Sequence, residues 1–399
     1  MKLRKKKEKV FLKDTDKVSV TIDLWKSGQH ISYMVVTAHF VDSEWKLQKR
    51  TLNFYDVPPP HTGVVICDVL KKCLVEWGIE DKVQTISVDN ASYNDVVNSL
   101  ALHGKLFNVR CCAHILNLLV QDGLSDIADI IKNMRESVKH LVASESRRLI
   151  FSEIAKQLKL PSKKLLLDCG TKWNATYFML SAALEFKDVF PRYQQRDSSY
   201  TYLPSEDYWQ KVKELCSFLE EFNEVTNFIS GTEYPTSNLF LPELYSIQKL
   251  LDEAHENGNI YMKVMVDKMK CKFDKYWGDY ARKIKIIGSE ISSCEIQKEG
   301  YSYTISGKGK IRGRAQFYSY IRNVDCVIEQ AKSELDWKMN NMKFRILSKM
   351  ARDVLSIPII IVASESAFSA GGRIIDQHRA LLEAEIVQDK KDIQEVILP

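Results

Sequence analysis

Two aspartates lie in strand-like stretches, where they could present carboxylates to a metal ion. Asp23 lies inside the apolar segment TIDLW, where a buried carboxylate without partners would be costly. Asp89 lies where the segment SVDN ends, and ligands in open α/β sheets collect near the C-terminal ends of parallel strands. If both aspartates reach one edge of a sheet, they bring two oxygen donors together, and carboxylate oxygens suit Mg²⁺ or Mn²⁺ better than zinc.

Both aspartates also have ordinary structural interpretations. Asp23 could be a capping or edge-strand residue that is exposed to water. Asp89 could be the turn residue of an Asx-type bend before a helix. Residue type and position leave these alternatives open.

The first third of the sequence predicts the elements that would position these residues. Residues 18–25 alternate β-branched and polar residues, as a half-buried strand does, and two further strand candidates follow after short links, which predicts an antiparallel meander. The run PPPH ends the third strand, and a helical period that closes at Gly78 follows. The predicted strands are 18–25, 32–41, 47–57, 83–90 and 107–114, and the predicted helices are 64–77, 93–102 and one that begins near 114. This order, β-β-β-α-β-α-β-α, is the one that an RNase H-like fold requires.

The remainder of the sequence is mostly helical in pattern. From about residue 122 to about 350, apolar residues recur at i, i+3 and i+4. Residues 288–313 are richer in Gly and Ser and predict a surface loop. The segment IPIIIVASESAFS is too apolar to lie in water, so we expect it in the core against the sheet.

Composition and charge limit the binding partners and the cellular location that can be expected of this protein. The 57 basic and 52 acidic residues give a formal net charge of +5, which permits nucleic-acid binding without requiring it. Basic clusters at Lys2–Lys9 and Ser306–Arg314 can equally be solvated surface. The nine cysteines follow neither a disulfide framework nor a repeated zinc pattern. Because no transmembrane run or signal-peptide core is present, we expect a cytosolic or nuclear protein.

Six ordered blocks of the sequence resemble the motifs of plant hAT transposases. They are TIDLWKS, SVDNASYND, NVRCCAHILNL, DCGTKWNATYFML, KFDKYW and DVLSIPIIIVASESAFSAGGR. The similarity is greatest to zinc finger BED domain-containing, RICESLEEPER-like proteins, and it extends from about Val18 to about Arg379. The last block is the most specific of the six.

The resemblance implies an α/β fold with an RNase H-like mixed sheet core. A large all-helical insertion interrupts this core, and a C-terminal hAT dimerisation segment completes it. We therefore expect a basic N-terminal stub (1–17), the first part of the core (18–121), a helical insertion (122–287), a flexible loop (288–315), and a return to the core with the dimerisation region (316–399).

In that family a D-D-E triad binds two divalent metal ions. Matched residue by residue, the resemblance implies Asp23, Asp89 and Glu365 as catalytic, metal-binding residues, and Glu365 rests on the resemblance alone. The implied cofactor is Mg²⁺ or Mn²⁺, and two such ions can activate the attacking oxygen and stabilise the leaving oxygen of a phosphodiester. No zinc is expected in this chain.

Four further residues are expected to bind DNA. Cys111 and His114 form a CxxH motif, which is half of a structural zinc site. They could simply be a buried Cys and a packed His, whereas the resemblance implies that they organise the active site and the flanking DNA. Trp173 could fill a core, whereas the resemblance implies that it stacks on a flipped base. Lys172 beside it would meet a phosphate.

The sequence departs from the family pattern in several places. We expect no BED-type zinc finger ahead of the core. A block resembling VLDPRYKL is missing, and a helix ending in WWK and the usual dimerisation tail are replaced. The expected function is that of a nuclear, DNA-binding, homodimeric or higher-order protein with the ancestry of a metal-dependent cut-and-paste transposase. The alternatives are a domesticated non-catalytic DNA-binding or gene-regulatory protein, and a decaying element copy.

Overall fold

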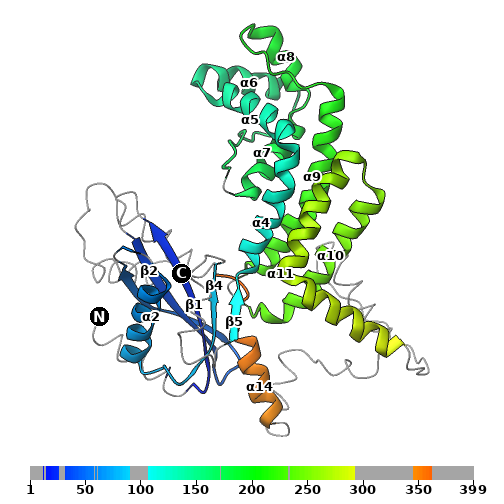
Figure 1. Cartoon of the computed structure of the whole chain (residues 1–399). Coiled ribbons are helices and arrows are strands. Elements are labelled where there is room, and N and C mark those ends of the chain that lie inside the picture. The colour runs from blue at the N-terminus through cyan, green and yellow to red at the C-terminus, as the bar shows by residue number, and fades with distance from the viewer. Residues whose placement is uncertain are drawn as a thin grey trace. The chain divides into compact units, whose positions relative to one another are not determined.

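The computed structural model describes most of the chain (Figure 1). The described residues are 12, 15–26, 32–57, 59–60, 62–89, 107–170, 172–231, 234–292 and 345–361. Their contacts divide into two units. The sheet unit holds the described residues up to Ile115, together with Ile229–Leu241 and 345–361, and the helical unit holds Leu116–Phe228 and residues 242–292.

The sheet unit is built on a five-stranded mixed sheet with the order β3-β2-β1-β4-β5. The strands are β1 (Val18–Lys26), β2 (Ser32–Val41), β3 (Leu47–Asp56), β4 (Val83–Val88) and β5 (Phe107–Arg110). Strands β1, β2 and β3 form the predicted antiparallel meander, and β4 and β5 are parallel to β1. The mixed sheet expected from the sequence is therefore confirmed. The helix predicted at 93–102 lies outside the described residues.

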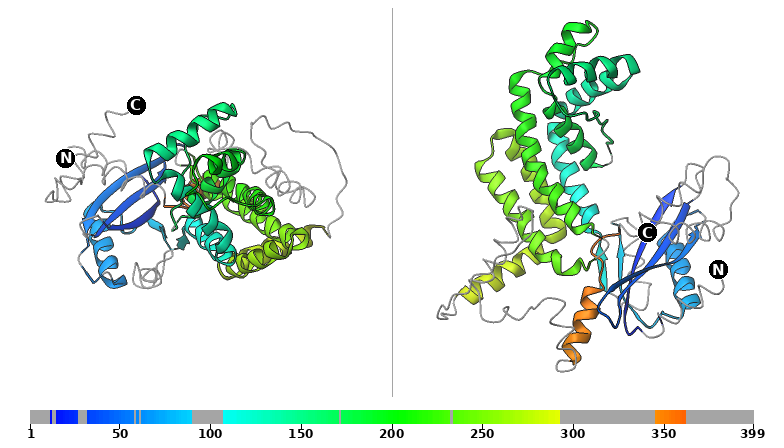
Figure 2. Two further views of the ribbon diagram at one scale, coloured as in Figure 1. Left: turned by 90° about the horizontal axis from the view of Figure 1, so that it is seen from above. Right: turned by 180° about the vertical axis from the view of Figure 1, so that it is seen from behind.

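Helix α2 (Gly63–Trp77) covers one face of this sheet (Figure 1 and Figure 2). The helix begins at Thr62, whose side chain accepts a hydrogen bond from the backbone N–H of Val65. It ends at Gly78, whose φ of 65° is a left-handed conformation that glycine adopts without a steric penalty. Its apolar face packs on the side of β1 that carries Val20 and Ile22. This core leaves the opposite side of β1, with Asp23, facing away from α2.

The returning C-terminal segment belongs to the same unit. Helix α14 (Arg345–Leu355) is followed by a largely buried segment, which is described as far as Ile361. The side chains of Ile359, Ile360 and Ile361 are 5%, 4% and 3% exposed, so the apolar IPIII stretch is buried as expected. Residues 229–241, which we expected inside the helical insertion, group with the sheet.

The helical unit confirms the predicted all-helical insertion. Helix α4 (Cys112–Leu124) leads into it, and aromatic side chains fill its interior, with Phe151 in edge contact with Phe186 and Phe190. The remaining elements are η2 (Ser125–Ile127), α5 (Ala128–Val142), α6 (Glu145–Gln157), α7 (Trp173–Glu185), α8 (Val189–Arg196), α9 (Glu206–Ile229), η3 (Ser237–Leu239, in the sheet unit), α10 (Phe240–Asn257) and α11 (Ile260–Ser292). Helix α11 extends into the stretch that we predicted to be a loop. None of the helices in the described residues is long and apolar enough to span a bilayer.

Candidate active site

The register of β1 and β4 brings the two predicted aspartates together. These parallel strands pair Val20 with Ile86 and Thr21 with Ser87. Continuing this register by two residues places Asp89, which directly follows β4, opposite Asp23. Because side chains alternate along a strand, both carboxylates emerge on the face opposite α2. Both residues are half-buried.

The same face of the sheet receives the segment that leads to Glu365. The Ser87 hydroxyl donates to the Pro358 carbonyl at 2.6 Å, and the Cys112 N–H donates to the Ile359 carbonyl at 2.8 Å. The adjacent Cys111 N–H bonds the carbonyl of Val88, the residue before Asp89. The adjacent residues Cys111 and Cys112 therefore link the end of β4 to Ile359 through their backbone hydrogen bonds. Glu365 itself lies outside the described residues.

The carboxylate oxygens of Asp23 and Asp89 are ligands of the kind that Mg²⁺ and Mn²⁺ prefer. Neighbouring strands lie about 4.8 Å apart, so two carboxylates at paired positions on one face can ligate a single cation. Among the described residues, no three His, Cys, Asp or Glu side chains are grouped as a metal site. A complete site would therefore need a third ligand from outside those residues.

Beside this pair, the face carries buried polar side chains. His39 on β2 is 4% exposed, and its Nε2 lies 3.1 Å from the Thr21 hydroxyl. Burial, together with the smaller effect of the positive charge of Lys49 on β3, lowers the pKa of His39 from 6.5 to about 3. The ring is therefore neutral at physiological pH.

Acidification is expected to destabilise the sheet unit through His39. Below its ordinary pKa of 6.5 the unfolded chain binds a proton that the folded chain does not bind until about pH 3. The free energy of unfolding should therefore fall by about 2 kcal/mol between pH 7.5 and 5. His39→Gln should remove this loss, as measured by denaturant unfolding at both pH values. His255→Gln, at an exposed site, is the control, and equal pH slopes for wild type and His39→Gln would contradict the prediction.

The predicted CxxH pair lies next to β5. Cys111 is 1% exposed, and His114, in the first turn of α4, is half-buried. The neighbouring Cys112 is also buried, and burial raises the pKa of its thiol well above the usual range. The backbone N–H of Cys111 bonds the end of β4. The role of the Cys111 and His114 side chains toward DNA stays a prediction.

Trp173 lies in the core of the helical unit. Only 1% of its surface is exposed, and its ring is in edge contact with Phe222 of α9. The backbone N–H of Trp173 donates to the side-chain oxygen of Asn117 on α4 at 3.1 Å, which caps the start of α7. In this conformation the indole is not available to a base, which agrees with the core alternative. Lys172 is exposed, so its ammonium can reach a phosphate.

The motif DCGTKWNATY contains a buried ion pair that sequence reasoning missed. Asp168 has a fully buried side chain and accepts hydrogen bonds from Nε and a terminal nitrogen of Arg135 on α5. The Thr176 hydroxyl of α7 donates to its other oxygen at 2.9 Å. Asp168 thus joins α5 to α7. In the sequence, the local sign of this contact is an Asp that lies eight residues before a Thr in a predicted helix.

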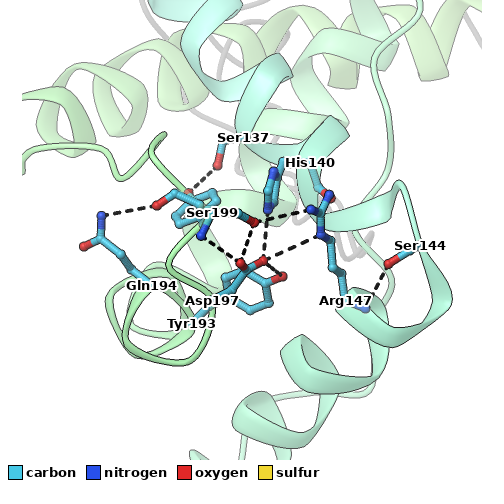
Figure 3. Close-up of polar contacts among 9 residues, drawn as sticks. Ser137, His140, Ser144, Arg147, Tyr193, Gln194, Asp197 and Ser199 are labelled. Atoms are coloured by element: carbon cyan, nitrogen blue, oxygen red, sulfur yellow. Dashed lines mark hydrogen bonds and ion pairs between the residues drawn. The ribbon is translucent and has the colours of Figure 1, made fainter.

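A second polar cluster, shown in Figure 3, closes the ends of α5, α6 and α8. Asp197 accepts hydrogen bonds from the Tyr193 hydroxyl at 2.8 Å and the Ser199 N–H at 3.0 Å, and it pairs with His140 Nε2 at 3.1 Å. Arg147 lies 3.6 Å from the same carboxylate. These contacts hold the pKa of Asp197 well below its usual range, with the Ser199 hydroxyl as the largest cause. Because His140, Arg147, Tyr193 and Ser199 all contact the Asp197 carboxylate, we interpret the cluster as structural.

Comparison with protein families finds matches in both the sheet unit and the helical unit. Residues 21–111 match the ZBED1 RNase-like domain, and residues 109–218 match the ZBED1 RNase-like helical domain. Residues 238–287 match the hAT-like transposase, RNase-H fold. Residues 320–390 match the hAT family C-terminal dimerisation region. The five-stranded sheet is thus the RNase H-like core, and α4 to α9 lie mainly in its helical domain.

Similar proteins occur in plants. The chain is 34% identical to zinc finger BED domain-containing protein RICESLEEPER 2 of Oryza sativa subsp. japonica, over 93% of this chain and 64% of that protein. It is 30% identical to the putative AC transposase of Zea mays and to zinc finger BED domain-containing protein DAYSLEEPER of Arabidopsis thaliana, over 96% and 92% of this chain. It spans 57% and 62% of the length of those two proteins. With its RNase H-like core, helical domain and dimerisation region, the chain belongs to the hAT transposase family.

Proposed function

We propose that this chain is a nuclear, DNA-binding, self-associating transposase-like protein that cleaves phosphodiester bonds at its sheet. The observation that supports this best is the parallel register of β1 with β4, which, continued by two residues, brings Asp89 opposite Asp23. Asp23, Asp89 and Glu365 would hold Mg²⁺ or Mn²⁺, which supplies Lewis-acid stabilisation of charge on the phosphoryl group.

The chain's own residues supply position and charge. Asp23 lies on β1, which pairs with β2 and β4, and Asp89 directly follows β4, so the sheet holds the backbone at or next to both residues. The bonds from Ser87 and Cys112 anchor the segment that leads to Glu365. Exposed Lys172 would meet a phosphate of bound DNA.

A DNA nicking assay tests the proposal. Plasmid DNA with the terminal repeats of a related element is incubated with the full chain and Mg²⁺, Mn²⁺ or EDTA. Nicking that needs the divalent ion is the expected result. Absence of cleavage from a folded, self-associated sample would reject the enzymatic proposal.

A non-catalytic DNA-binding function is the second candidate. The match to RICESLEEPER 2 extends over 460 residues, which exceeds the 399 residues of this chain, so that relative carries internal residues that this chain lacks. Missing segments could leave DNA binding without a closed active site. In that case mobility shifts should show salt-sensitive DNA binding, and the nicking assay should show no cleavage with either metal.

A further inference from the structure

Three polar side chains form a hydrogen-bonded cluster where the segment that follows α14 packs on the sheet. The hydroxyl of Ser356, which is 2% exposed, lies 3.1 Å from the hydroxyl of Ser19 on β1. The side-chain amide of Gln84 on β4 donates to Ser356 at 3.0 Å and to Ser19 at 3.2 Å. We call Ser19, Gln84 and Ser356 the polar clamp. Because its two hydroxyls are buried, they favour the one arrangement in which they are hydrogen-bonded.

The polar clamp also holds the C-terminal end of α14. The Gln84 amide and the Ser356 hydroxyl both donate to the Asp353 carbonyl, at 2.6 and 2.8 Å. Carbonyls in the last turn of a helix have no partner within the helix, so these donors satisfy one of them. The point at which α14 ends and the following segment begins is therefore tied to β4.

From the polar clamp, the segment runs in the same direction as β4. Ser356 accepts its hydrogen bond from Gln84, which is the second residue of β4. Two residues later, the Pro358 carbonyl accepts a hydrogen bond at 2.6 Å from Ser87, which is the fifth residue of that strand. Asp89 directly follows β4. The segment therefore advances along the sheet toward the end that carries the candidate carboxylates.

We propose that the polar clamp positions the metal site of the proposed phosphodiester cleavage. The inference rests on the proposed function and adds residues that do not touch the metal ion. Ser19 lies four residues before Asp23, which is roughly 13 Å along an extended strand. The clamp acts through the segment after α14, because it fixes the register in which that segment approaches the carboxylates. Glu365, the third proposed ligand, follows Ser356 by nine residues.

The physical reason is the conformational freedom of the segment. A segment that is already held in one register loses less of this freedom when a cation binds, so the cation binds more tightly. Residues that orient metal ligands without touching the metal typically change metal affinity about 10–100-fold when they are replaced. Loss of the polar clamp should therefore weaken metal binding. It should leave DNA affinity unchanged, because no charged side chain is lost.

Mn²⁺ binding to the full chain without DNA tests the inference. Ser356→Ala removes the hydroxyl that Ser19 and Gln84 contact, and Gln84→Met keeps the side-chain length but removes the amide donors. Each variant should bind Mn²⁺ about 10-fold more weakly than wild type, as measured by the electron paramagnetic resonance signal of the free ion. The Mn²⁺ concentration that gives half-maximal nicking should rise by the same factor. A purely structural loss would lower the amount of active protein and leave that concentration unchanged.

Thr85→Val is the matched control, because it removes a buried hydroxyl from the same strand without removing a bond of the polar clamp. Thr85 is 2% exposed, and its hydroxyl has no hydrogen-bond partner among the described residues. Wild-type Mn²⁺ affinity in either clamp variant would overturn the inference, and so would an equal loss in Thr85→Val. If wild type bound Mn²⁺ no more tightly than Asp89→Asn, the metal site of the proposed function would itself be rejected, and the inference with it.

Discussion

Asp89→Asn is expected to reduce metal-dependent DNA cleavage at least ~1,000-fold, because bound metal supplies several kcal/mol of transition-state stabilisation. The substitution keeps the size of the side chain and removes the negative charge that a cation needs. Asp23→Asn should have a similar effect, since the register of β1 and β4, continued by two residues, brings the two residues opposite each other. The rate of nicking under single-turnover conditions is the measurement.

The matched control for these variants is Asp68→Asn. Asp68 is exposed on α2, which covers the other face of the sheet, so its loss should leave cleavage unchanged. DNA affinity in a mobility shift should also persist in Asp89→Asn, because the change adds no negative charge. Cleavage by Asp89→Asn at the wild-type rate would exclude Asp89 as a metal ligand.

Arg135→Ala is expected to lower the free energy of unfolding of the helical unit by about 3 kcal/mol. The Asp168 side chain is fully buried, whereas that of Arg135 is 38% exposed. Removing Arg135 would leave a buried, uncompensated carboxylate that still accepts a hydrogen bond from the Thr176 hydroxyl. Denaturant unfolding followed by tryptophan fluorescence measures the loss, because Trp173 is buried beside this motif.

A double-mutant cycle isolates the ion pair from other effects. In the background of Asp168→Asn, Arg135→Ala should cost much less, because no buried charge remains. The control is Lys139→Ala on the same helix, whose partner Glu136 is 3.7 Å away at the surface, with an expected change within about 0.5 kcal/mol. If Arg135→Ala were as mild as this control, the ion pair would not stabilise the helical unit.

The strands and α2 could be predicted because their signals are local. Residues 18–25 alternate β-branched and polar side chains in the strand period, and Gly78 ends a helical period, so the predicted bounds agree closely with β1 and α2. The order of six motifs was sufficient to recognise the family. The sequence predicted that Asp23 and Asp89 could lie on neighbouring strands. The register of β1 with β4, continued by two residues, brings the two residues opposite each other.

Other features could not be predicted, because one residue type serves two environments. A tryptophan is suited both to a core and to stacking on a base, and contacts with Phe222 and Asn117 place Trp173 in the core. The partner of buried Asp168 lies on another helix, and no periodicity identifies Arg135 as that partner. Such pairs depend on how helices pack rather than on local sequence.

Amino-acid order alone was enough to establish the family, the mixed sheet and the two candidate aspartates, because motif order and strand period are properties of short segments. The folded chain determined the face on which Asp23 and Asp89 emerge, since α2 packs against the other side. It also determined which side of α14 faces solvent. An amphipathic pattern predicts that a helix has an apolar stripe, but only contacts such as Arg352 with Trp45 decide whether that stripe faces the core or solvent.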